Sequence, residues 1–115
     1  MQVAMVVSWK TPVRGREMRA LEYASDVDTY WKKQAEAGVC SEPELFFGQS
    51  GWSMWMIKGD AEAIRIAWLD DEAQKLMVEG ELLLDGFMWQ EMLTGAAGDV
   101  HLARMAGAAQ RFGAS

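Results

Sequence analysis

Cysteine and histidine are nearly absent, since the 115-residue sequence contains one residue of each kind. Cys40 therefore cannot form an internal disulfide, and no neighbour in sequence marks it as a nucleophile, so we expect a structural role. The lone histidine, His101, cannot assemble a metal site without a second histidine or a cysteine pair. The adjacent carboxylates of residues 70–72 point in different directions on a helix and do not converge. We expect no metal ion and no cofactor.

Long apolar runs are also missing, because no stretch approaches the roughly 20 residues needed to cross a bilayer. Residues 1–10 carry no basic leader before their apolar side chains and no small-residue cleavage motif, which favours a strand over a secretion signal. Nine methionines without a cysteine framework suit a reducing compartment. We therefore predict a cytoplasmic protein that does not enter a membrane.

Positive charge is scarce in the second half of the chain. The formal net charge is −6, and residues 60–91 carry two Lys/Arg against nine Asp/Glu. Nucleic-acid binding depends on basic stripes that neutralise phosphates, so we expect no nucleic-acid partner. A glycine-rich phosphate loop and a serine-elbow motif are absent as well.

Half of the residues are apolar, which is enough for one domain with a buried core. Residues 3–9 alternate as a strand, and residues 44–60 form two strands joined by a tight turn at 48–51. Residues 87–92 predict a fourth strand. Apolar side chains stand on both faces of these strands, whereas a sheet with one face in water alternates apolar with polar residues.

Three other stretches have the period of helices. The first lies between residues 15 and 38, and its predicted buried stripe is Met18, Leu21, Ala24, Val27, Trp31 and Ala35. Residues 60–84 predict two helical pieces with a bend near 69–71, where acidic residues favour a second helix start. A linker of small residues, 95–98, is expected before a last helix that Asp99 caps and that runs to about Arg111.

The predicted order is β-α-β-β-α-β with an extra C-terminal helix, an α+β ferredoxin-like domain with a four-stranded antiparallel sheet. Residues 1–95 form this domain and residues 96–115 a helical extension. Two helices cover one face of the sheet, which leaves the other apolar face bare. We expect a symmetric homodimer in which sheet faces sheet; the alternative is that the last helix covers the bare face.

Two segments carry a resemblance to a known family. The hairpin ends in WSMWMIKGD at residues 52–60, and the helical region that follows, WLDDEAQKLMVEGELLLDG at 68–86, precedes the last strand. Over roughly residues 3–93 the chain resembles the dimeric α/β-barrel superfamily, which includes antibiotic-biosynthesis-monooxygenase-like proteins. The resemblance implies a dimeric α/β barrel.

The resemblance implies several activities. Such proteins include cofactor-independent oxygenases, haem-degrading enzymes, small-molecule isomerases and ligand-sensing domains, so fold is no guide to reaction. Haem-degrading relatives ligate iron through a histidine on a helix, and the position of His101 past the fourth strand argues against haem. Oxygenase relatives use aromatic and amide side chains between helices and sheet, but this chain has no asparagine.

The aromatic and methionine side chains of the hairpin and last strand are the candidate ligand-binding residues. Six tryptophans either fill the core and dimer interface or form a flat pocket for an apolar or aromatic ligand. Methionine suits either arrangement. The predicted ligand-binding residues are Trp52, Trp55, Trp89, Met54 and Met56. If Trp55 faces the partner, Trp55→Asp should dissociate the dimer.

Two residues are candidate proton handlers. Glu91, in an otherwise apolar strand, would have a raised pKa and act as a general base if buried, or would simply be wet at the strand end. Tyr30 is the other candidate. The first hypothesis is a protein that binds a small apolar or aromatic molecule between sheet and helices. The alternative is a cofactor-independent monooxygenase or isomerase acting on an aromatic or polyketide-like substrate.

Overall fold

The order of strands and helices is the predicted one, with two short strands added. The computed structural model describes residues 1–113. Its elements are β1 (Gln2–Trp9), β2 (Thr11–Pro12), α1 (Glu17–Glu36), β3 (Glu44–Phe46), β4 (Ser53–Asp60), α2 (Ala61–Trp68), α3 (Asp71–Leu83), β5 (Leu84–Asp85), β6 (Met88–Leu93) and α4 (Gly95–Arg111).

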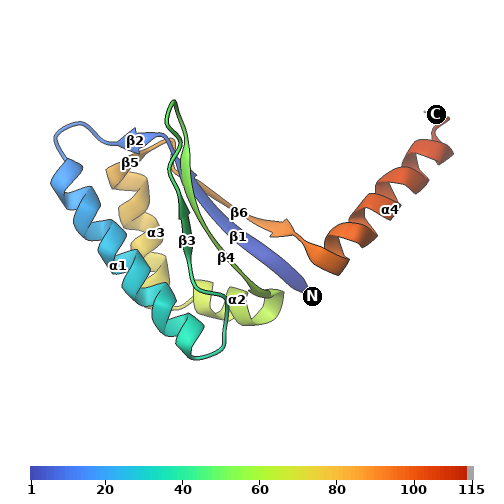
Figure 1. Ribbon diagram of the computed structural model, residues 1–115, viewed down its shortest axis with the longest axis horizontal. Coiled ribbons are helices and arrows are strands. Elements are labelled where there is room, and N and C mark those ends of the chain that lie inside the picture. Colours follow the sequence, from blue (N-terminus) through green and yellow to red (C-terminus); the bar gives the residue numbers. More distant parts are fainter. Residues whose placement is uncertain (114–115) are drawn as a thin grey trace.

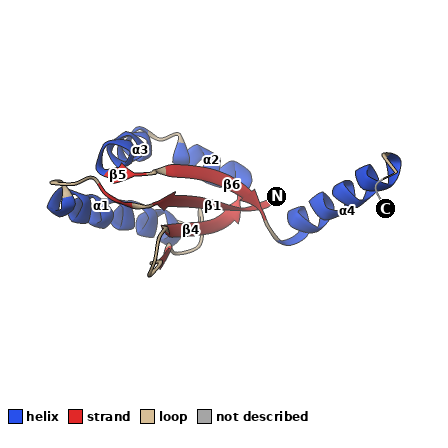
Figure 2. Ribbon diagram, turned by 90° about the horizontal axis from the view of Figure 1, so that it is seen from above, coloured by secondary structure: helices blue, strands red, loops and turns tan. Residues whose placement is uncertain are grey.

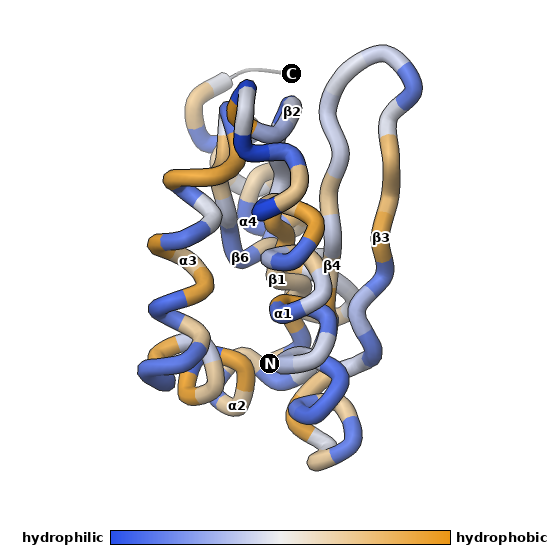
Figure 3. The backbone as a smooth tube through the Cα atoms, turned by 90° about the vertical axis from the view of Figure 1, so that its left-hand side faces the viewer, coloured by the Kyte–Doolittle hydropathy of each residue, from blue (hydrophilic) through white to orange (hydrophobic). Residues whose placement is uncertain are grey.

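The main sheet has four strands in the order β3-β4-β1-β6, and each neighbouring pair is antiparallel. Figure 3 shows these strands side by side in this order. Met5 at the centre of β1 lies opposite Ile57 of β4 and Glu91 of β6. The predicted α+β class with a four-stranded antiparallel sheet is therefore confirmed. Beyond the break at Thr11, β2 pairs with β5 as a separate two-residue ladder.

The core lies between one face of this sheet and the helices (Figure 1). Alternation along the strands places every second residue on that face, including Val3, Val7 and Ile57, all of which are fully buried. The helices contribute large side chains such as Trp31 and Trp68. This packing explains why the strands carry apolar side chains on the face that the helices cover.

The opposite face of the sheet has no helix over it within residues 1–113. On this face lie Met54 and Met56 of β4 and the exposed side chains of Phe46, Met88 and Met92. We call this surface the open sheet face. The last helix, α4, extends away from the domain instead of covering it (Figure 2), so the alternative in which that helix covers the bare face is wrong for this chain.

The predicted stripe of α1 is wrong in its first turns. Met18 is 73% exposed and Leu21 is also exposed, whereas Ala20, Tyr23 and Tyr30 are buried. Tyr23 packs beside Gly80 of α3 and Tyr30 beside the end of α2, and this rotates the buried face by one to two residues from the one that aliphatic side chains alone predict.

The helix boundaries follow their capping residues. Asp60 accepts a hydrogen bond from the Ala63 backbone N–H at 3.2 Å, and Asp70 accepts one from that of Glu72 at 3.3 Å. The predicted bend between two helical pieces is confirmed, because α2 ends at Trp68 and α3 begins at Asp71. The predicted linker 95–98 is wrong, because these residues form the first turn of α4.

The division into residues 1–95 and 96–115 stays a prediction, and residues 114–115 of the extension lie outside the described part of the chain. None of the helices in residues 1–113 combines the length and hydrophobicity needed to span a bilayer.

Candidate functional site

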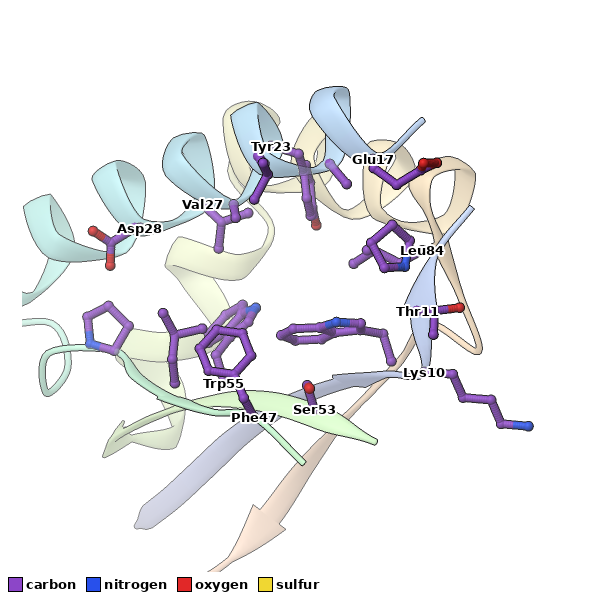
Figure 4. A pocket seen from close by; sticks show the side chains of 17 residues that line it. Lys10, Thr11, Glu17, Tyr23, Val27, Asp28, Phe47, Ser53, Trp55 and Leu84 are labelled. Atoms are coloured by element: carbon purple, nitrogen blue, oxygen red, sulfur yellow. The ribbon is translucent and has the colours of Figure 1, made fainter. Parts of the chain in front are cut away.

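A cavity of about 290 Å³ lies between α1 and the helix-side face of the sheet. Its walls come from the end of β1, from β2, from one side of α1 and from the β3–β4 hairpin (Figure 4). Most of the lining side chains are apolar. All the lining residues together are Trp9, Lys10, Thr11, Pro12, Glu17, Ala20, Leu21, Tyr23, Ala24, Val27, Asp28, Pro43, Leu45, Phe47, Ser53, Trp55 and Leu84.

Trp55 anchors the sheet side of the cavity. It stands on β4 opposite Leu45 of β3, and its side chain is only 6% exposed. Its ring centroid lies 5.9 Å from that of Trp31 and 6.2 Å from that of Trp68, both with tilted planes. These contacts hold the indole in one orientation, so the wall it forms is rigid.

Tyr23 forms part of the helix side (Figure 4). A β-carbon at Gly80 of α3 would stand 2.5 Å from the Tyr23 hydroxyl oxygen and 2.6 Å from the Phe87 ring, so only glycine leaves room for this phenol. Burial, and then the charge of Glu79, raise the pKa of Tyr23 well above its ordinary value. The hydroxyl therefore stays protonated and is available as a hydrogen-bond donor.

Tyr23 was not among the candidate site residues predicted from the sequence. Its spacing from Val27 and Tyr30, four and then three residues, was the available signal, because these three share one buried stripe of α1.

Charged side chains stand at the rim of the cavity. In Figure 4 the Lys10 side chain points away from the enclosed space. Its Nζ lies 5.2 Å from the centroid of the Trp52 ring, a cation–π contact. Trp52 is itself 49% exposed and does not line the cavity. The Lys10 ammonium thus lies outside the cavity, whose lining keeps the hydroxyl-bearing side chains of Tyr23 and Ser53 among mostly apolar residues.

The five predicted ligand-binding residues are not brought together. Trp55 lines the cavity, but Met54 and Met56 lie on the open sheet face, because alternate residues of β4 point to opposite sides. Trp89 is on the helix side of the sheet, where its ring packs 5.2 Å from that of Trp68, and it does not line the cavity. The hairpin therefore serves two separate surfaces.

Glu91 is held by an ion pair. The Arg65 guanidinium donates to both carboxylate oxygens, at 2.8 and 2.6 Å, and the Glu91 side chain is 24% exposed. These charge-assisted hydrogen bonds lower the pKa of Glu91 despite partial burial. A buried general base requires the opposite shift, so this geometry does not provide the raised pKa expected for that role.

Tyr30 is a packed core residue. Its hydroxyl donates to the Ala67 carbonyl oxygen at 2.8 Å, and its ring makes an edge contact with that of Trp31 at 4.9 Å. Burial, followed by the charges of Asp70 and Glu72, raises the pKa of Tyr30 to about 12. The phenol connects α1 to the end of α2 and does not reach the cavity.

Cys40 is half-buried beside the core, and burial raises the pKa of its thiol to about 11. The reactive thiolate is therefore scarce at neutral pH. Within residues 1–113, no group of three His, Cys, Asp or Glu side chains is arranged to hold a metal ion.

No protein-family model matches the sequence, and no curated protein matches it either. Similarity appears at the level of structure. A conserved protein of unknown function from Bacteroides thetaiotaomicron, suggested to be an oxidoreductase, superposes with a TM-score of 0.63 at 12% identity over 79% of this chain and 95% of its own.

Two other solved structures bear on the fold. A dimeric protein of unknown function with a ferredoxin-like fold, from Bacteroides fragilis, gives a TM-score of 0.56 at 10% identity, covering 78% of this chain and 93% of its own. A protein from Chloroflexus aurantiacus, provisionally assigned as an antibiotic biosynthesis monooxygenase, gives 0.56 at 8% identity, covering 84% and 96%.

These neighbours define the class of the protein by its fold. The chain has the ferredoxin-like fold, and the resemblance to antibiotic-biosynthesis-monooxygenase-like proteins is confirmed at the level of that fold. At identities of 8 to 12%, these comparisons show the fold alone.

Proposed function

We propose that the protein binds a small apolar or aromatic molecule in the cavity between α1 and the sheet. The observation that carries this proposal is the lining of the cavity. Aromatic walls from Trp9, Tyr23, Phe47 and Trp55 surround about 290 Å³. Small-molecule sites are concave, mostly apolar and equipped with a few polar groups, and their volumes start at about 300 Å³.

The polar groups of the wall limit the chemistry of the ligand. Ser53 is buried on the sheet side and the phenol of Tyr23 stands on the helix side. Both hydroxyls can donate to a carbonyl or phenol oxygen of a guest. A flat molecule with one or two oxygen atoms, such as a quinone, matches this arrangement.

Tryptophan fluorescence tests the proposal, because Trp9 and Trp55 line the cavity. Titration with naphthoquinone should give saturable quenching. Ala24→Trp places a large ring inside the cavity and should abolish saturation, whereas Ser25→Trp adds the same ring on the exposed side of α1 and should leave binding unchanged. Saturable binding that survives Ala24→Trp would place the ligand elsewhere.

A cofactor-independent monooxygenase or isomerase remains a second candidate. It is favoured by the protonated Tyr23 hydroxyl in the wall and by the provisional assignment of the Chloroflexus aurantiacus protein. In this candidate Tyr23, in place of the predicted proton handlers Glu91 and Tyr30, donates a hydrogen bond to developing negative charge on an aromatic or polyketide-like substrate.

Oxygen consumption with naphthohydroquinone and product analysis test this second candidate. Tyr23→Phe should lower the turnover rate more than it weakens binding, because the substitution removes only the hydroxyl. Saturable binding without turnover would leave the binding function alone.

We also propose that the protein forms a homodimer through the open sheet face. Phe46, Met88 and Met92 leave much of their apolar surface exposed there, and Met54 and Met56 lie between them. Burying such a patch contributes about 25 cal/mol per Å². The dimeric Bacteroides fragilis neighbour supports this assembly.

The proposed location is the reducing cytoplasm, because a chain with a single cysteine does not depend on an internal disulfide that such a compartment would reduce. We also keep the expectation that nucleic acids do not bind, which fluorescence anisotropy with labelled DNA and RNA tests. Saturable binding at physiological salt would contradict it.

A further inference from the structure

The C-terminal helix makes few packing contacts with the rest of the chain. In its 17 residues α4 has no buried side chain, and its main contacts are with β1 and β6, beside its starting end. Isolated helices of this length are marginal in water, and the three glycines at positions 95, 98 and 107 weaken this one further. The helix therefore needs a surface to pack on.

One face of α4 is suited to such packing. Leu102, Met105, Ala109 and Phe112 are spaced three and four residues apart and form one apolar stripe. Leu102, Met105 and Phe112 are exposed. Arg104 and Arg111 stand on the opposite side of the helix and mark the face that remains in water.

The position of α4 indicates what covers the stripe. Figure 1 shows α1 and α3 on one side of the sheet and α4 on the other, where the open sheet face lies. A second copy docked on the open sheet face occupies the side toward which α4 extends. The exposed apolar stripe and the open sheet face then belong to one continuous interface.

The area of the sheet face points to the same conclusion. Four strands about 4.8 Å apart and about 20 Å long present a flat extent of about 400 Å². A stable interface of ordinary size buries about 800 Å² on each partner. A helix of this length, about 25 Å long and about 10 Å wide, adds about 250 Å². α4 therefore enlarges the flat extent available for an interface by more than half.

We infer that α4 is an arm that packs its stripe of Leu102, Met105, Ala109 and Phe112 against the partner subunit of the homodimer. The inference rests on the proposed dimer through the open sheet face. It gives the C-terminal extension a role in assembly, and it predicts that the arm orders only when the partner is present.

Paired substitutions in the full-length chain test the arm. Leu102→Asp combined with Met105→Asp should raise the dimer dissociation constant at least about tenfold in sedimentation velocity over a dilution series. Val100→Asp combined with Ala103→Asp adds the same charge to the same helix away from the stripe and should leave the dissociation constant within about twofold. Equal dissociation constants for the two variants would overturn the arm.

Amide hydrogen exchange gives an independent measurement. The amides of α4 should be protected in the dimer and exchange rapidly in Met88→Asp, which is designed to separate the sheet faces. Protection that persists in the monomer would place α4 on its own chain and overturn the inference. If the natural chain itself sediments as a monomer of 12.9 kDa, the proposed dimer fails, and the arm fails with it. If the chain is a dimer whose dissociation constant is unchanged by the stripe substitutions, only the inference about the arm fails.

Discussion

Truncation of Trp55 should be one of the most destabilising single changes in this domain. Its indole is 6% exposed and packs against the rings of both Trp31 and Trp68, which also contact each other. Replacement of a buried tryptophan by alanine costs about 3–5 kcal/mol, because transfer free energy is lost and a void remains. Domains of this size are stable by only about 5–15 kcal/mol, so Trp55→Ala removes a large share.

Trp52→Ala is the matched control, since the same ring is deleted from the same hairpin. Trp52 is 49% exposed, and its ring makes a cation–π contact with the Lys10 ammonium. Loss of that contact costs about 1 kcal/mol, and loss of the buried half of the ring costs about 1 kcal/mol more. The two variants should therefore differ by about 2 kcal/mol in their free energies of unfolding.

Urea denaturation at one fixed protomer concentration measures the difference, because dimer stability depends on concentration. With a slope of about 2 kcal/mol per M, Trp55→Ala should lower the midpoint by about 2 M and Trp52→Ala by about 1 M. A Trp55→Ala chain that keeps its midpoint but dissociates into monomers would refute the reasoning, because it would place Trp55 on the face that meets the partner.

Three other measurements follow from the described contacts. Met88→Asp puts a charge on the open sheet face and should give a 12.9 kDa monomer in sedimentation, whereas a dimer would exclude that face as the interface. The pKa of Tyr30 is about 12 in the folded chain and about 10 when unfolded, so its contribution to stability is complete below pH 10 and is lost as pH rises toward 12. Tyr30→Phe should therefore show a shallower alkaline loss than the natural chain, and identical pH profiles would contradict this assignment. Arg65 lowers the pKa of Glu91, so the ionised carboxylate stabilises the fold above pH 4.5, and this stabilisation is lost as the pH falls through the lowered pKa. Glu91→Gln should therefore lose less thermal stability than the natural chain as the pH is lowered. The same decrease in both chains would show that the ion pair does not contribute to stability.

The architecture could be predicted because local patterns determine it. Two-residue alternation marked the strands, and the carboxylates of Asp60 and Asp70 marked two helix starts that the structure contains. The first turns of α1 could not be predicted from aliphatic side chains, since Met18 and Leu21 lie on the exposed side while Tyr23 is buried. A tyrosine is buried only where its ring meets a partner, and the partner of Tyr23, the surface at Gly80, comes from α3.

The candidate site was predicted only in part for a similar reason. Alternation places Trp55 and Met56 on opposite faces, but nothing local states which face the helices cover. The sequence left Trp55 open between a pocket and the dimer interface; it lies between sheet and helices, whereas Met56 lies on the open sheet face. The ion partner of Glu91 was invisible for the same reason, since Arg65 is 26 residues away in sequence.

The small β2–β5 ladder limits how a guest molecule can reach the cavity. Thr11, Pro12 and Leu84, which line one end of it, belong to this ladder, and backbone hydrogen bonds of 2.8 Å from Lys10 to Asp85 and from Val13 to Leu83 continue it on either side. These hydrogen bonds hold the two chain segments together at that end of the cavity. We predict that a guest molecule enters from the hairpin side, where Pro43 and Phe47 line the cavity, so that lengthening the 48–51 loop changes the rates of association and dissociation more than the affinity.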